Sequence, residues 1–124
     1  MTKSKQLVER RKHKRFKAPT DAFVAIRPHY SEVGQMIDVS MGGLGFNCLA
    51  MQDPSNGSEL DIFLSGRAFW LHGIPFRTVW SVEIAGQTPL TSVPMRRSGV
   101  QFGALTPDQR SQLEYFIQHY GTEA

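Results

Sequence analysis

Residues 99–121, GVQFGALTPDQRSQLEYFIQHYG, change from strand-like to helical sequence within a few positions. Thr106 is suited to cap a helix, because its hydroxyl can accept a hydrogen bond from a free backbone N–H, and Pro107 suits the first helical position. Gln109 stands where a capping box requires it, and Gly121 is suited to end the helix. We therefore expect a helix from Pro107 to the residue before Gly121. Four apolar residues share one face of it, at i, i+3, i+4 and i+7: Leu113, Phe116, Ile117 and Tyr120.

Short strand-like segments fill the chain before this helix. Glycines and prolines divide the chain into pieces too brief for helices, and these pieces are rich in Val, Ile, Phe and Trp. Strands at such spacing indicate a β-sandwich or a small barrel, whose open side the apolar helix face would cover. Trp70 and Trp80 fall within two of the segments, and we expect them in the core or at an interface. The expected strands are 22–27, 35–39, 45–49, 60–64, 68–72, 76–84 and 99–104.

Size and composition limit the class of protein. The chain has 124 residues, 40% of them apolar, which fits one compact domain. It has no apolar run long enough for a membrane span or a signal peptide, so we expect a cytoplasmic protein without membrane insertion. Cys48 is the only cysteine and is expected to be buried, which excludes an internal disulfide. The histidines lack metal-ligand spacing and no catalytic set stands out, so we expect no metal, no cofactor and no enzyme activity.

Positive charge is concentrated at the N-terminus. Residues 1–17 carry eight Lys or Arg and one Glu, a net charge of +7, whereas the rest of the chain carries −4. Basic segments attract phosphates of any kind, so the expected partner is anionic: a nucleic acid, a membrane surface or a soluble nucleotide. The segment itself is expected to stay mobile until an anion binds, because it has little reason to dock on itself.

Two short motifs carry the chemistry of a nucleotide site. Arg11 and Arg15 are four residues apart, and guanidinium groups form paired hydrogen bonds with phosphate and with the O6 and N7 atoms of guanine. Asp38 and Ser40 are two residues apart, so their side chains would project from the same side of a strand. The carboxylate can accept from the N1 and N2 hydrogens of guanine. Gly43, in the turn that follows, allows the backbone to approach a ligand closely.

Each motif also has a simpler interpretation. The basic run from Arg10 to Arg15 is compatible with a solvated tail or with a general nucleic-acid arm. Asp38 and Ser40 are residue types that commonly cap turns by bonding to neighbouring backbone. A ligand site is favoured because both motifs occur in one chain together with the glycine and proline spacing that indicates a barrel.

Arg11-x-x-x-Arg15 followed by Asp38-x-Ser40-x-x-Gly43 resembles the two signature motifs of the PilZ domain family, which are receptors for cyclic di-GMP. The segment RSGVQF at 97–102, followed by the capped helix, is also similar to the end of that domain, so the resemblance covers roughly residues 9–120. It implies a mainly β fold, a six-stranded antiparallel, Greek-key-like barrel with a C-terminal α-helix. Residues 1–8 would then be a flexible basic extension and residues 121–124 a short tail.

The resemblance also implies residue roles. Arg11 and Arg15 would grip a guanine edge and phosphate from a mobile loop, while Asp38 and Ser40 would read the other guanine from the barrel surface. Gly43 would keep the turn open.

Arg10 carries a further implication of the resemblance. In this family an arginine directly before the first motif arginine is associated with two intercalated ligand molecules, and Arg10 stands at that place. We therefore expect a stacked pair of cyclic di-GMP molecules.

The resemblance therefore implies a bacterial cyclic di-GMP receptor in second-messenger signalling, acting in motility or biofilm regulation. Ligand would order the arginine loop over the barrel, and the altered surface would signal to an unidentified effector protein or through a homodimer. Two alternatives stay open: a degenerate barrel that binds only protein, in motility or secretion, and a basic-armed barrel that binds RNA or DNA. The second predicts aromatic side chains exposed on the barrel face and steep salt dependence, and the intact motifs disfavour both.

Overall fold

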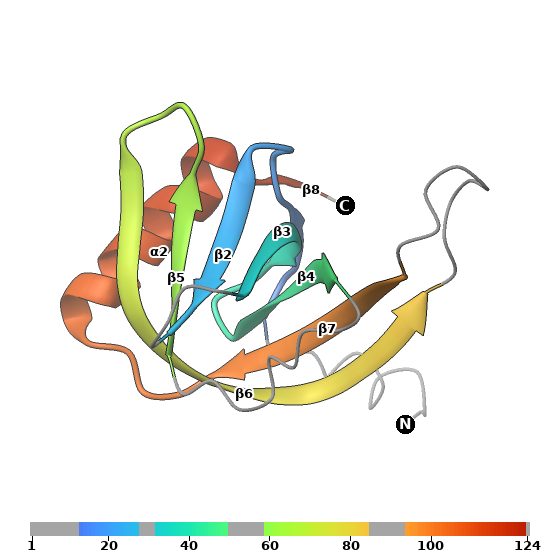
Figure 1. Ribbon diagram of the computed structural model, residues 1–124. Helices are drawn as coiled ribbons and strands as arrows, with labels where there is room; N and C mark the ends of the chain where they lie inside the picture. The colour runs from blue at the N-terminus through green and yellow to red at the C-terminus, as the bar shows by residue number, and fades with distance from the viewer. Residues whose placement is uncertain (1–12, 28–31, 50–58, 85–93, 124) are drawn as a thin grey trace, which may run out of the picture.

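The computed structural model describes residues 13–27, 32–49, 59–84 and 94–123, and in these it has an eight-stranded sheet and one helix (Figure 1). The elements in chain order are β1 (Phe16–Lys17), β2 (Ala22–Ile26), β3 (Glu32–Val39), β4 (Gly43–Leu49), β5 (Glu59–Leu64), β6 (Phe69–Ile84), β7 (Met95–Phe102), α2 (Pro107–Tyr120) and β8 (Thr122–Glu123).

Six of the strands close into a barrel. Their order is β2-β5-β6-β7-β4-β3, and β2 also pairs with β3, with every pairing antiparallel. The short strands β1 and β8 extend the sheet beyond β3. The expected six-stranded antiparallel barrel with a C-terminal helix is therefore confirmed. Closure pairs the strand edges that an open sheet would expose.

The barrel interior is filled by alternate residues of the strands. On β5, Leu60, Ile62 and Leu64 are buried, as period-two alternation requires for one inward face. Cys48 is buried within the same core, as expected. The largest fully buried side chain on β4 is Phe46.

Segments 68–72 and 76–84, expected as two strands, belong from Phe69 onward to one 16-residue strand, β6. Gly73, with φ +68°, donates its N–H to the carboxylate of Asp61 at 2.8 Å, so the glycine bends the strand without ending it. Pro75 lies where β6 stops pairing with β5 and starts pairing with β7, a position that tolerates a missing N–H. The long strand carries Trp80 past the barrel core to a position beside β7.

The C-terminal helix begins and ends where the sequence predicts. Thr106 Oγ1 accepts from the N–H of Gln109 at 3.0 Å, and Gln109 Oε1 accepts from the N–H of Thr106 at 3.0 Å, which completes the capping box. After Tyr120 the N–H of Gly121 donates to the carbonyl of Ile117. Gly121 is extended, with φ −80°, so it ends the helix without left-handed backbone. The buried residues of the helix are Leu113, Phe116 and Ile117.

Helix α2 covers the open side of the barrel along β6, as expected. Gln109 Nε2 donates to the carbonyls of His72 and Gly73 at 3.0 Å each, and the ring of Phe116 packs on that of Phe69 with centroids 5.2 Å apart.

In the described part of the chain, no helix is both long and apolar enough to cross a membrane.

Residues 14–17 of the basic segment contact the barrel and the C-terminal strand. β1 pairs with β3 and β8, and Lys14 Nζ lies 2.7 Å from a carboxylate oxygen of Glu123. The basic segment does have docking partners at residues 13–17, because Asp38 and Glu123 supply carboxylates to which Arg15 and Lys14 bind. The extension expected at residues 1–8 lies outside the described residues.

Candidate ligand-binding groove

A groove with a volume of about 580 Å³ lies on the barrel surface. Its walls come from β3, β4, β6 and β7, from the segment before β1 and from the start of α2. Four residues predicted for the ligand site line it together: Arg15, Asp38, Ser40 and Gly43. The structure therefore joins part of the arginine motif to the second motif in one concave site.

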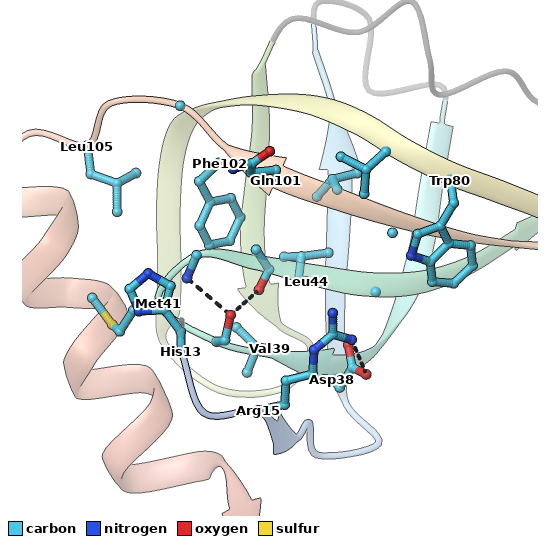
Figure 2. Close-up of a pocket in the computed structure, with 18 of the residues that line it drawn as sticks. His13, Arg15, Asp38, Val39, Met41, Leu44, Trp80, Gln101, Phe102 and Leu105 are labelled. Carbon is cyan, nitrogen blue, oxygen red and sulfur yellow. Dashed lines mark hydrogen bonds and ion pairs between the residues drawn. The ribbon is translucent and has the colours of Figure 1, made fainter. Parts of the chain in front are cut away.

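One cross-strand row runs through this groove. Asp38 on β3 pairs with Gly45 on β4, Gly45 pairs with Gly99 on β7, and Gly99 pairs with Trp80 on β6. Directly paired residues share a face of the sheet, so Asp38 and Trp80 stand at the two ends of a row whose inner positions are glycines. With strands about 4.8 Å apart, the row spans roughly 14 Å. Figure 2 shows Trp80 extending from β6 and Asp38 lying on β3, with β7 and β4 between these two strands.

The two inner glycines make room for the side chains at the ends. A Cβ atom at Gly45 would lie 2.9 Å from Asp38 Oδ1, and a Cβ atom at Gly99 would overlap the indole ring of Trp80. The carboxylate and the indole therefore lean over the glycines. The inner positions contribute no side chain of their own, so the acidic group and the aromatic ring lie close above a floor made of backbone.

Arg15 forms an ion pair with Asp38, with Nη1 and Oδ2 3.5 Å apart (Figure 2). The two side chains are 44% and 32% exposed, and pairs in contact with water typically contribute about 0–1 kcal/mol. Arg15 can therefore exchange Asp38 for another anion at small cost. That exchange would leave the carboxylate free to accept hydrogen bonds from a ligand.

The hydroxyl of Ser40 is engaged mainly in hydrogen bonds within the turn. It accepts from the N–H of Gly42 at 3.1 Å and donates to the carbonyl of Gly43 at 3.3 Å. The turn-capping interpretation is therefore correct for this residue. Because a hydroxyl has one hydrogen to donate and two lone pairs, one acceptor position is left for a ligand N–H.

Gly43 is fixed by packing between strands. A Cβ atom at this position would overlap the carbonyl of Val100 on β7. Its own carbonyl accepts from the N–H of Ser40 at 2.8 Å. A side chain at Gly43 would therefore separate β4 from β7 where the groove is formed.

The end of the groove nearest α2 carries residues that the sequence did not single out. His13 and Arg110 line it, and the ring of His13 lies against Gly42, where a Cβ atom would be 2.5 Å from ring Cδ2. Gln101 lines it too and accepts from Arg77 Nη2 at 2.7 Å. These positions are far apart along the chain, so no sequence spacing connects them.

Trp70 and Trp80 were expected in the core or at an interface, and the structure excludes the core for both. Trp80 is 41% exposed and lines the groove, and Trp70 is 48% exposed elsewhere on the barrel. A bulge between Thr78 and Trp80 shifts the register of β6 and sets the indole against Gly99. Simple alternation along 76–84 does not reveal this placement.

Trp70 belongs to a different cluster, centred on the carboxylate of Asp61, which is fully buried. Trp70 Nε1 and the N–H of Gly73 each donate to this carboxylate at 2.8 Å, and Arg27 Nε donates at 3.1 Å. Burial acts to raise the pKa of Asp61, but these donors outweigh it and lower the pKa to about 2. Asp61 is therefore ionised at neutral pH and holds Trp70 in place.

Arg10 and Arg11 lie outside the described residues, so their contacts remain predictions. Among the residues that the structure describes, no group of three or more His, Cys, Asp or Glu side chains is arranged to hold a metal ion.

The family model of the PilZ domain matches residues 9–119. The chain belongs to the PilZ domain family. The matched residues include both motifs, the groove and nearly all of α2. No protein among the curated sequences matches the chain.

Solved structures share the fold of this PilZ domain. The PilZ domain of YcgR from Escherichia coli, with c-di-GMP, is 16% identical with a TM-score of 0.69, and the match covers 90% of this chain and 91% of that one. The K. pneumonia MrkH–c-di-GMP complex is 16% identical with a TM-score of 0.65, covering 87% of this chain and 51% of that one. A longer YcgR chain in complex with c-di-GMP is 20% identical with a TM-score of 0.63, and 45% of it is covered. This PilZ domain thus spans about half the length of these last two proteins.

Proposed function

We propose that this PilZ domain is a receptor for cyclic di-GMP and is not an enzyme. The observation that carries the proposal is the row in which Asp38 and Trp80 flank Gly45 and Gly99. A guanine base needs an acceptor for its N–H groups and an aromatic face for stacking, and the row offers both on one face of the sheet. The c-di-GMP in the YcgR and MrkH structures supports the same ligand.

Asp38 and Ser40 are the proposed guanine readers. When Arg15 leaves Asp38, both carboxylate oxygens can accept from N1–H and N2–H of the base. Ser40 has its donor engaged by Gly43 and one acceptor position left, so it can only accept from the ligand. Asp38 and Ser40 thus offer acceptors and no donor to the base. This selects guanine, whose N1–H and N2–H groups can donate to both residues.

Trp80 is the proposed stacking platform. Its ring lies over Gly99 and is 41% exposed, so a base can lie on the indole without displacing core residues. Stacking of one base on an aromatic side chain contributes about 1–3 kcal/mol.

The arginine motif is proposed to supply the phosphate contacts. Arg15 would move from Asp38 to the ligand, and Arg10 and Arg11 would join it as the N-terminal loop becomes ordered over the groove. We further propose that two cyclic di-GMP molecules bind as an intercalated pair, with Arg10 serving the second. Ordering the loop would reduce the net affinity by the entropy that it costs.

A nucleic-acid-binding barrel also predicts exposed tryptophans, so Trp70 and Trp80 must be compared. Trp70 is stacked with Phe63, at 4.7 Å between ring centroids, and with His72, at 5.8 Å, and its N–H is held by Asp61. Trp70 is therefore already engaged. The described groove offers Trp80 as its tryptophan and ends at a carboxylate, which suits a small cyclic dinucleotide better than a polynucleotide.

The output is proposed to be a change of surface and not a chemical step. A loop that folds over the groove would create a new face for an effector protein or for a second copy of the chain in the cytoplasm. Control of motility or of biofilm formation is the proposed setting.

Calorimetric titration of the purified chain tests the ligand directly. Cyclic di-GMP should bind saturably. GTP and a short single-stranded RNA should bind more weakly, by about tenfold or more, because neither can place guanine on the row and its phosphates on the arginines at the same time. Repeating the titrations at low and high salt distinguishes a cyclic di-GMP receptor from a nucleic-acid-binding barrel, since polynucleotide binding falls steeply with salt. Equal binding of RNA and cyclic di-GMP would contradict the proposal. A protein-only barrel would bind none of the three.

A further inference from the structure

Two arginines flank the glycine row on the same outer face of the sheet. On β7, Arg97 and Gln101 each lie two residues from Gly99, so all three share a face, and Arg77 on β6 pairs directly with Gln101. Two residues along a strand correspond to roughly 7 Å, a distance that an arginine side chain can cover. Arg97 and Arg77 therefore stand on either side of the proposed base floor.

Each of these arginines is held by a neutral amide. Arg97 Nε donates to Asn47 Oδ1 at 2.9 Å, and Arg77 Nη2 donates to Gln101 Oε1 at 2.7 Å. Asn47 pairs with Arg97 in the ladder, and Gln101 pairs with Arg77, so both amides are fixed by the sheet itself. The guanidinium groups are thereby oriented.

Carboxylates hold other cations of the described chain. Lys14, Arg15, Arg27 and Arg67 form ion pairs with Glu123, Asp38, Asp61 and Asp21 respectively. An amide partner differs from a carboxylate in one respect, because it orients the guanidinium without cancelling its charge. Arg77 and Arg97 therefore keep a full positive charge in a defined direction beside the groove.

Such an arrangement is suited to a phosphodiester. A guanidinium retains further N–H groups after one of them bonds to an amide, and these can form paired hydrogen bonds with two phosphate oxygens. Prior orientation also reduces the entropy that binding must overcome. The spacing on both sides of the floor fits a ligand whose bases occupy the row and whose phosphates lie beside it.

We infer that Arg77 and Arg97 are phosphate-binding residues of the barrel wall, independent of the N-terminal arginine motif. The inference rests on the proposed cyclic di-GMP function and adds two contacts to it. Asn47 and Gln101 act as positioning residues for the two guanidinium groups.

Arg77→Gln and Arg97→Gln, alone and combined, test the inference by calorimetry with cyclic di-GMP. Glutamine can still bond to the neighbouring amide but has no charge, so the sheet is preserved and the phosphate contact is lost. Each single variant should bind about tenfold more weakly, and the double variant more weakly than either, with a smaller dependence of affinity on salt. Arg67→Gln is the matched control, because Arg67 is an exposed arginine paired with Asp21 in the turn between β5 and β6, off the strand positions that form and flank the glycine row. It should bind like the wild type.

Thermal unfolding of each variant verifies that the barrel is intact. If Arg97→Gln did not fold, Arg97→Lys would replace it, and its loss of paired donors should give a smaller decrease in affinity. Wild-type affinity in both glutamine variants would overturn the inference and leave the proposed function standing. An equal loss in Arg67→Gln would also overturn it, since the effect would then reflect net charge. If the wild type itself failed to bind cyclic di-GMP, both the function and the inference would fall.

Discussion

The indole of Trp80 lies over Gly99, its direct partner on the neighbouring strand, so closely that a Cβ atom at Gly99 would overlap the ring. Gly99→Ala should therefore push the indole off the floor. Because Trp80 is a partly exposed side chain that can move, the fold should persist while the affinity for cyclic di-GMP falls about tenfold. Calorimetry gives the affinity, and circular dichroism verifies the fold. A variant that folds and binds like the wild type would show that the ring position does not matter.

Trp80→Ala should weaken binding by about tenfold or more, since it removes a stacking contact of about 1–3 kcal/mol. Trp80→Phe should retain part of the affinity, because a smaller ring still stacks. The matched control is Trp70→Phe, which changes the other half-exposed tryptophan and should leave binding unchanged. The stacking role would be untenable if the two tryptophans had equal effects.

Asp38→Asn should reduce binding about tenfold or more, because the amide keeps one acceptor oxygen but replaces the other with N–H groups that face the N–H edge of guanine. Its effect on the free energy of unfolding should be small, since the ion pair with Arg15 is partly exposed. Affinity and the urea midpoint measured on one sample separate the two effects. A large stability loss with unchanged affinity would instead make Asp38 a structural residue.

Arg11→Ala and Arg15→Ala should each abolish binding while leaving the fold intact. Arg15 contacts Asp38 through an exposed pair, so its loss removes little stability, while the ligand loses a charged partner. Calorimetry of either variant that gave the wild-type affinity would refute the role of the motif.

Acid should weaken the fold through Asp61. Its pKa in the folded chain is about 2, below the ordinary 3.8, so its ionised form stabilises the fold above about pH 4 and this contribution disappears as the pH falls towards 2. The loss amounts to about 2 kcal/mol in the free energy of unfolding. Urea unfolding at several pH values measures it.

Asp61→Asn provides the comparison for the acid effect. At neutral pH it should be less stable than the wild type by about 3 kcal/mol, because Arg27 loses its anionic partner at a buried site. The difference should shrink by about 2 kcal/mol between pH 4 and pH 2. A difference that stayed constant with pH would mean that Asp61 does not titrate in this range.

Local signals in the sequence were sufficient for the helix and the fold class. Thr106, Pro107 and Gln109 act within a few positions of one another, so the start of α2 could be predicted from chemistry alone. The barrel followed from strand spacing together with the family resemblance. The continuity of β6 could not be predicted, because Gly73 and Pro75 normally interrupt strands and are accommodated here by a contact with Asp61 and by the change of pairing partner.

The groove was only partly visible in the sequence. Asp38, Ser40 and Gly43 form a short motif with its own spacing, whereas Trp80 reaches the same site through the pairing of β6 with β7 and a bulge. The proposed role of Arg77 and Arg97 depends on their hydrogen bonds to Gln101 and Asn47 on neighbouring strands. Such relations depend on strand register, which the sequence does not display.

The most direct measurement is a two-dimensional NMR titration with cyclic di-GMP that follows the two indole N–H signals and the glycine amides. The signals of Trp80, Gly45 and Gly99 should shift saturably, while those of Trp70 and Gly66 should stay in place. Saturable binding that moved Trp70 and left Trp80, Gly45 and Gly99 unchanged would place the ligand elsewhere and contradict the account.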